Sequence, residues 1–167
     1  WEMHDYIEWA KWLQQNPFVD TAKIMITGGS YGGYLTAMAL TYGAKYFIYG
    51  LCNYPVTDWA LYDSHYTERY MDLPKDNSEG YRFGSVMTHA DNYQKYGKSM
   101  LLLVHGAMDD NVHIQNTYQL VDTLQRLNKS FELMVFPGER HGWRGPKIPF
   151  TVDLRKRFIQ QYLFDKK

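Results

Sequence analysis

Cysteine is almost missing from this sequence, and a class of structural and metal sites is missing with it. Cys52 is the single cysteine among 167 residues, so the chain can form no internal disulfide and offers no thiolate cluster to a metal. His4, His65 and His89 lack the spacing of metal ligands. We therefore predict no metal site, and we expect Cys52 to be a small buried hydrophobic residue.

The sequence also lacks a net charge and a long apolar run. Lys and Arg total 18, and Asp and Glu total 18, so no net field would draw the chain to nucleic acid or to an anionic membrane. No apolar run approaches the ~20 residues of a membrane-spanning helix, and the first nine residues lack the order of a secretion signal. We expect neither nucleic acid nor membrane as a partner of this chain.

Four short apolar runs predict buried strands. Each is nearly continuous rather than alternating, as expected for strands covered on both faces; they are residues 23–27, 46–51, 100–104 and 131–136. Helical spacing, or good helix formers without a breaker, predicts helices around them, near residues 2–15, 34–40, 120–127 and 158–163. This order predicts an α/β fold with a mostly parallel sheet, a three-layer αβα sandwich in one domain over residues 1–167.

One aromatic and charged stretch does not fit that alternation. Residues 58–96 are too many for a simple crossover between strands, so we expect several short helices that stand over the strand ends. Loops at that edge of a parallel sheet commonly carry function.

The first apolar run ends in a G-x-S-x-G motif at residues 28–32. The motif lies between a predicted strand and a predicted helix, where a sharp turn would lift the Ser30 hydroxyl clear of the sheet. We expect Gly28 and Gly32 to let strand and helix approach. We also expect the Tyr31 N–H, at the helix start, to face a developing oxyanion. Taken alone, the pattern also fits a glycine-rich turn or a phosphate-binding loop.

A serine nucleophile needs a histidine base and a carboxylate, in the order Ser, acid, His for this fold. Asp109 and Asp110 follow the third predicted strand, and His141 follows the fourth. One aspartate of the pair is expected to cap the next helix. His105 directly follows a buried strand and is expected to make structural hydrogen bonds. The chemistry of such a triad requires no cofactor.

Three segments together resemble the catalytic domain of the prolyl oligopeptidase family, and its dipeptidyl peptidase IV branch in particular. They are G-G-S-Y-G-G-Y (28–34), Y-D-S-H-Y-T-E-R-Y-M (62–71) and H-G-A-M-D-D-N-V-H (105–113). The resemblance covers most of the chain, and T-E-R-Y-M is more specific to the branch than the nucleophile motif. It implies the C-terminal half of an α/β-hydrolase fold, with Asp109 as the acid of the triad.

The resemblance also implies a substrate site. Asn111 would hydrogen-bond a substrate carbonyl, and a pocket for the residue before the cut bond would be walled by Val56, Trp59, Tyr62, Tyr66 and Val112. An aromatic and aliphatic box suits a flat, apolar proline ring. Other aromatic residues are expected only to pack on the domain: Tyr46, Tyr49, Tyr70 and Trp143.

The sequence departs from the family in two respects. Gly29 stands where the dipeptidyl peptidase IV branch usually has Trp, and Gly there resembles the acylaminoacyl-peptidase branch. Trp1 is not an initiator Met, and we expect the first half of the sheet, a second oxyanion donor and a β-propeller to precede it. By itself the chain is expected to form a reduced sheet, to pair through an exposed strand edge into a homodimer, and to hydrolyse peptides poorly or not at all.

The predicted function is that of a serine peptidase that releases N-terminal X-Pro dipeptides through an acyl-enzyme on Ser30. Acylaminoacyl, tripeptidyl or endo-acting peptidases of the same family are the alternatives, with a catalytically inactive binding module and a carboxylester hydrolase further from the sequence pattern. Peptides are the expected partners. Bacterial family members suggest a periplasmic or secreted location by analogy alone.

Overall fold

The protein is built around a parallel four-stranded sheet. The computed structural model describes residues 2–164. The strands lie side by side in their order along the chain, as β1 (Met25–Gly29), β2 (Tyr49–Asn53), β3 (Met100–Gly106) and β4 (Glu132–Phe136). Because all four run in one direction, their carboxyl ends meet at one edge of the sheet.

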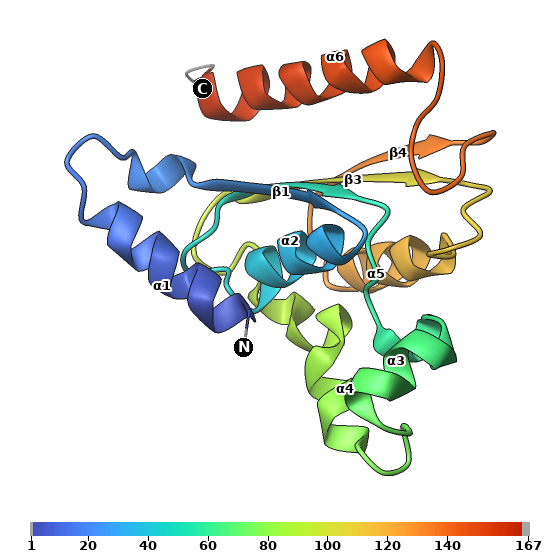
Figure 1. The fold of residues 1–167 in the computed structure, drawn as a ribbon. Helices are drawn as coiled ribbons and strands as arrows, with labels where there is room; N and C mark the ends of the chain where they lie inside the picture. Colours follow the sequence, from blue (N-terminus) through green and yellow to red (C-terminus); the bar gives the residue numbers. More distant parts are fainter. Residues whose placement is uncertain (1, 165–167) are drawn as a thin grey trace.

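Helices cover both faces of this sheet, which confirms the predicted three-layer αβα sandwich. One face carries α1 (Glu2–Gln14), α2 (Tyr31–Thr41) and α5 (Gln115–Arg126), whereas α6 (Lys147–Ile159) lies across the other (Figure 1). A short π-helical segment, Gln160–Phe164, continues α6. Each helix between strands carries the chain back across the sheet, as parallel pairing requires.

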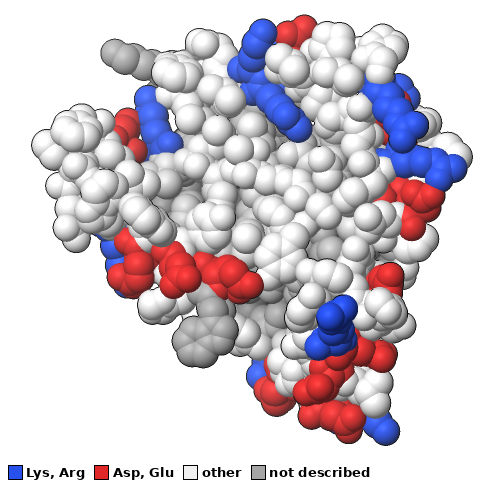
Figure 2. Space-filling view, in the orientation of Figure 1, with Lys and Arg blue, Asp and Glu red and all other residues white. Residues whose placement is uncertain are grey.

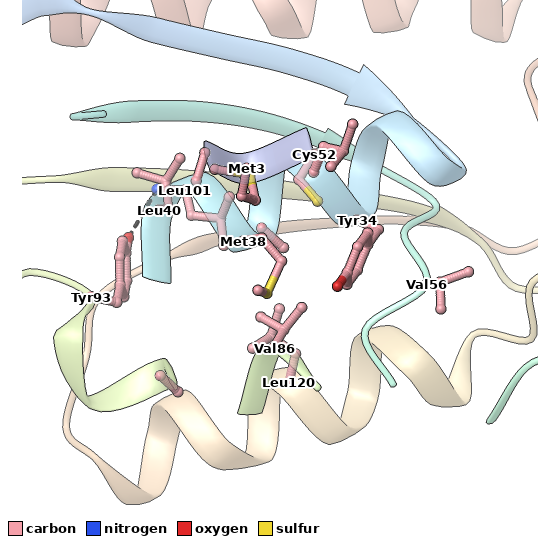
Figure 3. Packing of buried hydrophobic residues seen from close by; sticks show 14 of the residues in the cluster. Met3, Tyr34, Met38, Leu40, Cys52, Val56, Val86, Tyr93, Leu101 and Leu120 are labelled. Atoms are coloured by element: carbon pink, nitrogen blue, oxygen red, sulfur yellow. Dashed lines mark hydrogen bonds between the residues drawn. The ribbon is translucent and has the colours of Figure 1, made fainter. Parts of the chain in front are cut away.

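Strand β3 shows why its sequence is continuously apolar. Leu101 and Leu103 belong to the larger core cluster, with residues of α2 and α5. Leu102 and Val104 face the opposite way and pack in a second cluster under α6. Alternate side chains of a strand point to opposite faces, so a strand covered on both sides needs apolar residues throughout. Figure 3 shows the larger cluster, in which Met38 of α2 lies near Val86 and Leu120.

The second strand begins three residues later than its apolar run predicts. The backbone N–H groups of Tyr46 and Phe47 both donate to the carbonyl of Gly43, at 2.8 and 3.3 Å. These bonds form turns after α2 and keep residues 46 and 47 out of the sheet. The pairing of β2 with β1 therefore starts at Tyr49, opposite Met25.

The stretch over residues 58–96 folds into short helices, as predicted. It contains a 3₁₀ turn (Trp59–Leu61), α3 (Ser64–Met71), α4 (Ser78–Gly84) and a second 3₁₀ segment (Val86–Asn92). Side chains cap three of these starts: Asp58 accepts from the Ala60 N–H, Asp63 from that of Tyr66 and Asn77 from that of Gly80. The stretch extends away from the sheet beyond the layer of α2 and α5 (Figure 1).

Charge is mixed over the surface. On the face shown in Figure 2, acidic and basic side chains surround a broad uncharged area. Among residues 2–164, no helix is both long and apolar enough to cross a bilayer. The mixed surface charge agrees with the equal numbers of acidic and basic residues in the chain.

Candidate active site

Ser30 occupies a sharp turn between β1 and α2. Its backbone angles, φ 60° and ψ −121°, lie outside the regions that non-glycine residues ordinarily adopt. The Ser30 N–H donates to the Asn53 carbonyl at 3.0 Å, and the Ser30 carbonyl accepts from the Tyr34 N–H at 3.0 Å. Strained residues of this kind persist only where the surroundings hold them, and they gather at functional sites.

The close approach at this turn depends on Gly28 and Gly33, whereas the motif suggests Gly28 and Gly32. A Cβ at Gly28 would collide with the backbone of Gly32, and one at Gly33 would lie 2.6 Å from the Asn53 carbonyl oxygen and 3.0 Å from Pro55 Cα. A Cβ at Gly32 would meet nothing within 4 Å. The prediction that Gly32 is needed for close approach is therefore wrong, because it is the backbone of Gly32 that lies close to β1.

This difference predicts opposite effects for two neighbouring substitutions. Gly33→Ala should lower the free energy of unfolding by roughly 1–3 kcal/mol, since the added methyl must displace backbone rather than a side chain. Gly32→Ala, the matched control in the same helical turn, should be neutral or stabilise by up to about 1 kcal/mol. Urea unfolding followed by tryptophan fluorescence measures both. Equal effects would contradict the steric assignment.

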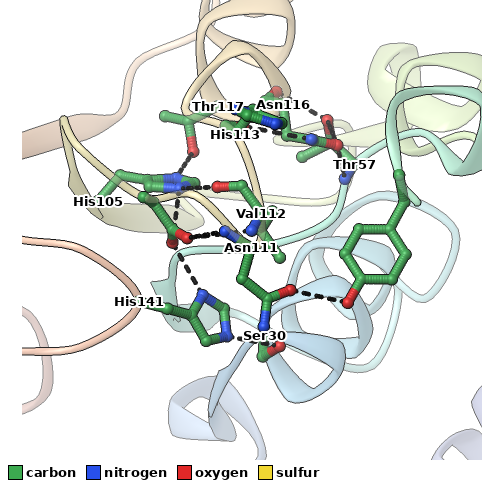
Figure 4. Close-up of polar contacts among 11 residues, drawn as sticks. Ser30, Thr57, His105, Asn111, Val112, His113, Asn116, Thr117 and His141 are labelled. Atoms are coloured by element: carbon green, nitrogen blue, oxygen red, sulfur yellow. Dashed lines mark hydrogen bonds and ion pairs between the residues drawn. The ribbon is translucent and has the colours of Figure 1, made fainter.

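The structure brings Ser30, His141 and Asp109 into one hydrogen-bonded line (Figure 4). His141 Nε2 lies 2.9 Å from Ser30 Oγ, and His141 Nδ1 lies 2.8 Å from Asp109 Oδ2. A carboxylate can only accept, so the proton resides on Nδ1 and leaves Nε2 to accept the serine proton. This is the arrangement that a serine nucleophile requires of its base.

Asp109 is fixed by the start of its own loop. Its Oδ1 accepts from the backbone N–H groups of Asn111 and Val112, both at 3.0 Å, and its side chain is fully buried. The expectation that one aspartate of the pair caps the next helix is wrong. Helix α5 begins at Gln115 without a side-chain cap, and Asp110 instead pairs with Arg140 at the surface.

His105 makes structural hydrogen bonds, as predicted. It is fully buried, with Nε2 2.8 Å from the Val112 carbonyl and Nδ1 2.7 Å from Thr117 Oγ1. The carbonyl only accepts, so Nε2 carries the proton and the Thr117 hydroxyl donates to Nδ1. Burial lowers the pKa of His105, because the charged form loses its hydration.

A neutral buried histidine makes stability depend on pH. Below about pH 6.5 the unfolded chain protonates His105 while the folded chain resists it, so the unfolded state binds more protons. The free energy of unfolding should fall as pH drops from 7 to 5, with a His105 share of at most about 1.4 kcal/mol per pH unit. His105→Gln should flatten that slope in urea unfolding, and His65→Gln, at an exposed site, should not. Parallel slopes for wild type and His105→Gln would refute this assignment.

Tyr31 begins α2 directly after Ser30. The first N–H groups of a helix have no partner within it, so the Tyr31 N–H stands where an anion beside Ser30 would be bound. The Tyr31 hydroxyl donates to Glu2 Oε1 at 2.7 Å, and that bond is the largest cause of the lowered pKa of Glu2. Burial, chiefly, raises the pKa of Tyr31. Its side chain is thus anchored to α1.

Three of the predicted pocket residues form an aromatic cluster, which contacts the residue after Ser30 through the rings of Trp59 and Tyr31, 5.6 Å apart. The rings of Trp59 and Tyr66 stack at 6.3 Å, and Tyr62 meets both edge-on, at 6.1 and 5.4 Å. The Tyr62 hydroxyl donates to Asn111 Oδ1 at 2.8 Å, which ties the cluster to the Asp109 loop.

The residues predicted to form one substrate site lie in different surroundings. Val56 and Val112 are buried in the core. Trp59 and Tyr66 line a cavity of about 540 Å³ together with Tyr31 and Tyr34, but Ser30 does not line it. Tyr62 and Asn111 line a separate hollow of about 760 Å³. Neither of these two cavities is lined by all six predicted residues.

Two aromatic residues assigned to packing behave differently from each other. Trp143 packs on Phe136, with ring centroids 4.7 Å apart. Tyr70 is 69% exposed, lines the 540 Å³ cavity and contacts the Tyr66 ring at 5.1 Å. The packing assignment is wrong for Tyr70, since its position on α3 places it one turn after Tyr66.

Comparison with known proteins identifies the family. A model of the prolyl oligopeptidase family matches residues 1–165. The chain belongs to the prolyl oligopeptidase family. The crystal structure of Porphyromonas gingivalis dipeptidyl peptidase 4, a solved structure similar to this chain, superimposes with a TM-score of 0.89 at 39% identity, over 97% of this chain and 23% of that one. The resemblance to the dipeptidyl peptidase IV branch is thereby confirmed.

Curated fungal relatives agree. The protein named "Probable dipeptidyl-aminopeptidase B" of Arthroderma otae is 43% identical over 144 residues, which cover 85% of this chain and 15% of that protein. The one of the same name from Trichophyton verrucosum is 42% identical over 165 residues, covering 98% of this chain and 18% of that protein. The chain thus spans less than a fifth of the length of these prolyl oligopeptidase family relatives.

One polar network behind the nucleophile of this family member was missed by sequence reasoning. Asn53 at the end of β2 donates from Nδ2 to the Gly28 carbonyl at 2.9 Å, and its Oδ1 accepts from Arg155 of α6 at 3.1 Å. Asn53 thereby ties the turn at Ser30 to the helix on the far face of the sheet. The signal was available, because a polar side chain that ends a buried apolar strand requires partners.

Proposed function

We propose that residues 1–167 are part of the catalytic α/β-hydrolase domain of a serine peptidase that releases N-terminal dipeptides, with proline preferred in the second position. The hydrogen-bonded line from Ser30 through His141 to Asp109 carries this proposal. Membership of the prolyl oligopeptidase family and the names of the relatives support the reaction class.

The geometry supports a two-step acyl transfer. Ser30 Oγ attacks the carbonyl carbon of the second residue while His141 Nε2 takes the hydroxyl proton. The tetrahedral oxyanion accepts a hydrogen bond from the backbone N–H of Tyr31. His141 then gives its proton to the leaving amine, and the carbon–nitrogen bond breaks. Water, deprotonated by His141, then attacks the ester carbonyl; the bond to Ser30 Oγ breaks, His141 returns the proton to Oγ, and the dipeptide leaves. Asp109 holds the imidazole in the required tautomer throughout.

We assign the specificity of this reaction to the aromatic cluster. Trp59 contacts the Tyr31 ring at the start of α2, and Tyr62 and Tyr66 pack on Trp59. Large rigid rings bind an apolar proline ring at little entropic cost. In this proposal Val56 and Val112 support the floor of the pocket, and Asn111 donates its amide to a substrate carbonyl. The bond from Tyr62 to Asn111 Oδ1 supports this role, because it turns the Asn111 nitrogen away from Tyr62.

Cleavage of Gly-Pro p-nitroanilide by the full natural chain tests the proposal. A dipeptidyl peptidase should release nitroaniline from it and leave its N-acetylated form nearly intact. Preference for an acetylated single-residue anilide would indicate an acylaminoacyl peptidase, and cleavage of a peptide blocked at both ends would indicate an endo-acting enzyme. Absence of all three activities in a folded preparation would refute the proposed function.

The proposal on assembly is separate. β1 is an outer strand of the sheet described over residues 2–164, and unpaired strand edges favour pairing with another chain. We propose that the 167-residue chain alone forms a homodimer through this edge. Light scattering that gives a monomer mass at micromolar concentration would contradict it.

A further inference from the structure

We propose that Tyr54 is a positioning residue, which holds the His141 imidazole over Ser30, and that Gly29 is small in order to leave room for the Tyr54 ring. This inference rests on the proposed function, since it assigns a role within the same triad.

The Tyr54 ring lies directly against the base. Its centroid is 4.6 Å from that of the His141 ring, at an interplanar angle of 57°. The Tyr54 ring also contacts the Trp143 ring, with centroids 5.3 Å apart. Trp143 packs in turn on Phe136 at the end of β4. The Tyr54 ring is therefore packed between the imidazole and a support built on the sheet.

The same ring also lies against the residue before the nucleophile. A Cβ at Gly29 would lie 2.8 Å from both Cε2 and the hydroxyl oxygen of Tyr54, and 2.9 Å from its Cζ. These atoms form the far end of a side chain, so any side chain at position 29 would displace the Tyr54 ring rather than the backbone. A side chain at position 29 and the Tyr54 ring in its observed place therefore exclude each other.

The backbone of Tyr54 is held in an uncommon conformation. Its φ is 34°, in the left-handed region that non-glycine residues seldom occupy, and its N–H donates to the Val104 carbonyl at 2.6 Å. Such conformations persist where the surroundings hold them and gather near functional sites. Residue 54 follows the last residue of β2, so this turn directs the ring toward the loop that carries His141.

The packing restrains a motion that the hydrogen bonds leave free. His141 is bonded through its two ring nitrogens, to Asp109 and to Ser30. Both bonds lie at the edges of the ring, and they oppose a swing of the ring plane about the line joining them only weakly. A ring packed on the imidazole limits that swing.

Substitution of Tyr54 in the full natural chain tests the role. Tyr54→Ala should lower kcat for Gly-Pro p-nitroanilide by roughly 10- to 100-fold, the size of effect that a misplaced catalytic group produces. KM should change less than about twofold, because the ring does not belong to the proposed proline pocket. Tyr54→Phe should restore kcat to within about threefold of wild type, since the ring and not the hydroxyl makes the contact.

A substrate-independent readout separates positioning from binding. The rate at which diisopropyl fluorophosphate labels Ser30 should fall in Tyr54→Ala in parallel with kcat, with the circular dichroism spectrum unchanged. A wild-type rate of labelling in Tyr54→Ala would overturn the inference. If wild type is labelled but cleaves no dipeptide anilide, the proposed function fails while the labelling comparison still decides the role of Tyr54.

Gly29→Ala provides a second variant, in which residue 54 is still tyrosine. Alone it should displace the Tyr54 ring and lower the labelling rate, as Tyr54→Ala does. Combined with Tyr54→Ala it should have no further effect, because the space is then empty; the two losses should not multiply. Losses that do multiply would overturn the link between Gly29 and Tyr54. If Tyr54→Ala is poorly folded, Gly29→Ala by itself still tests the role of the ring, and a wild-type labelling rate in Gly29→Ala would overturn the inference.

Discussion

Replacing Ser30 by Ala should lower kcat for Gly-Pro p-nitroanilide by roughly 10⁶-fold, the loss seen when the serine of such a triad is removed. In the proposed mechanism Ser30 Oγ carries the acyl group, and no other hydroxyl lies within hydrogen-bonding distance of His141 Nε2 among the described residues. What remains should be the slow reaction supported by the Tyr31 N–H and by binding alone. KM should change little, because Oγ contributes to the reaction rather than to ground-state binding.

Ser78→Ala is the matched control for this measurement. Ser78 is an exposed serine at the start of α4, outside the triad and the aromatic cluster, so its removal should leave kcat within about twofold of wild type. Circular dichroism of both variants should match wild type. A Ser30→Ala protein that keeps more than about a thousandth of wild-type kcat would exclude Ser30 as the nucleophile, because the residual activity of triad variants lies far below that level.

The fold was predictable because hydrophobic pattern determines most of it. A run such as Met100 to Val104 is apolar at every position, which specifies a strand buried on both faces, and the structure has it so. The order of Ser30, Asp109 and His141, which follow β1, β3 and β4, was also readable, since parallel strands bring their carboxyl ends to one edge of the sheet. Local chain geometry, such as the turn after which β2 begins only at Tyr49, could not be predicted, because it depends on individual hydrogen bonds.

Residues that act through packing were harder to predict than residues that carry chemistry. Tyr54 belongs to no sequence motif. The role proposed for it follows only from its contacts in space, with the His141 and Trp143 rings and with the backbone of Gly29. Gly32 presents the reverse case, because the motif emphasises it although a side chain there would meet nothing. The acid could not be chosen between Asp109 and Asp110 from spacing alone, since adjacent residues in a loop can point in opposite directions.

That choice leads to the second large effect, which Asp109→Asn should show. In wild type, Asp109 Oδ1 accepts the N–H groups of Asn111 and Val112 while Oδ2 accepts from His141. An asparagine has one side-chain oxygen, and the N–H groups of Asn111 and Val112, which both donate to Oδ1 in wild type, should hold that oxygen on their side. Its amide nitrogen is thereby turned toward His141 Nδ1, which must become an acceptor. The imidazole proton then resides on Nε2, and Nε2 can no longer accept the proton of Ser30.

The expected loss in kcat is about 10⁴-fold, the size found when a triad aspartate is changed to asparagine with its geometry intact. Asp110→Asn is the matched control, one residue away in the same loop. Its side chain is 61% exposed and pairs with Arg140 at the surface, and such surface pairs are worth little. That variant should keep kcat within about threefold of wild type, whereas equal losses in the two variants would mean that loop structure, and not the tautomer of His141, is what Asp109 provides.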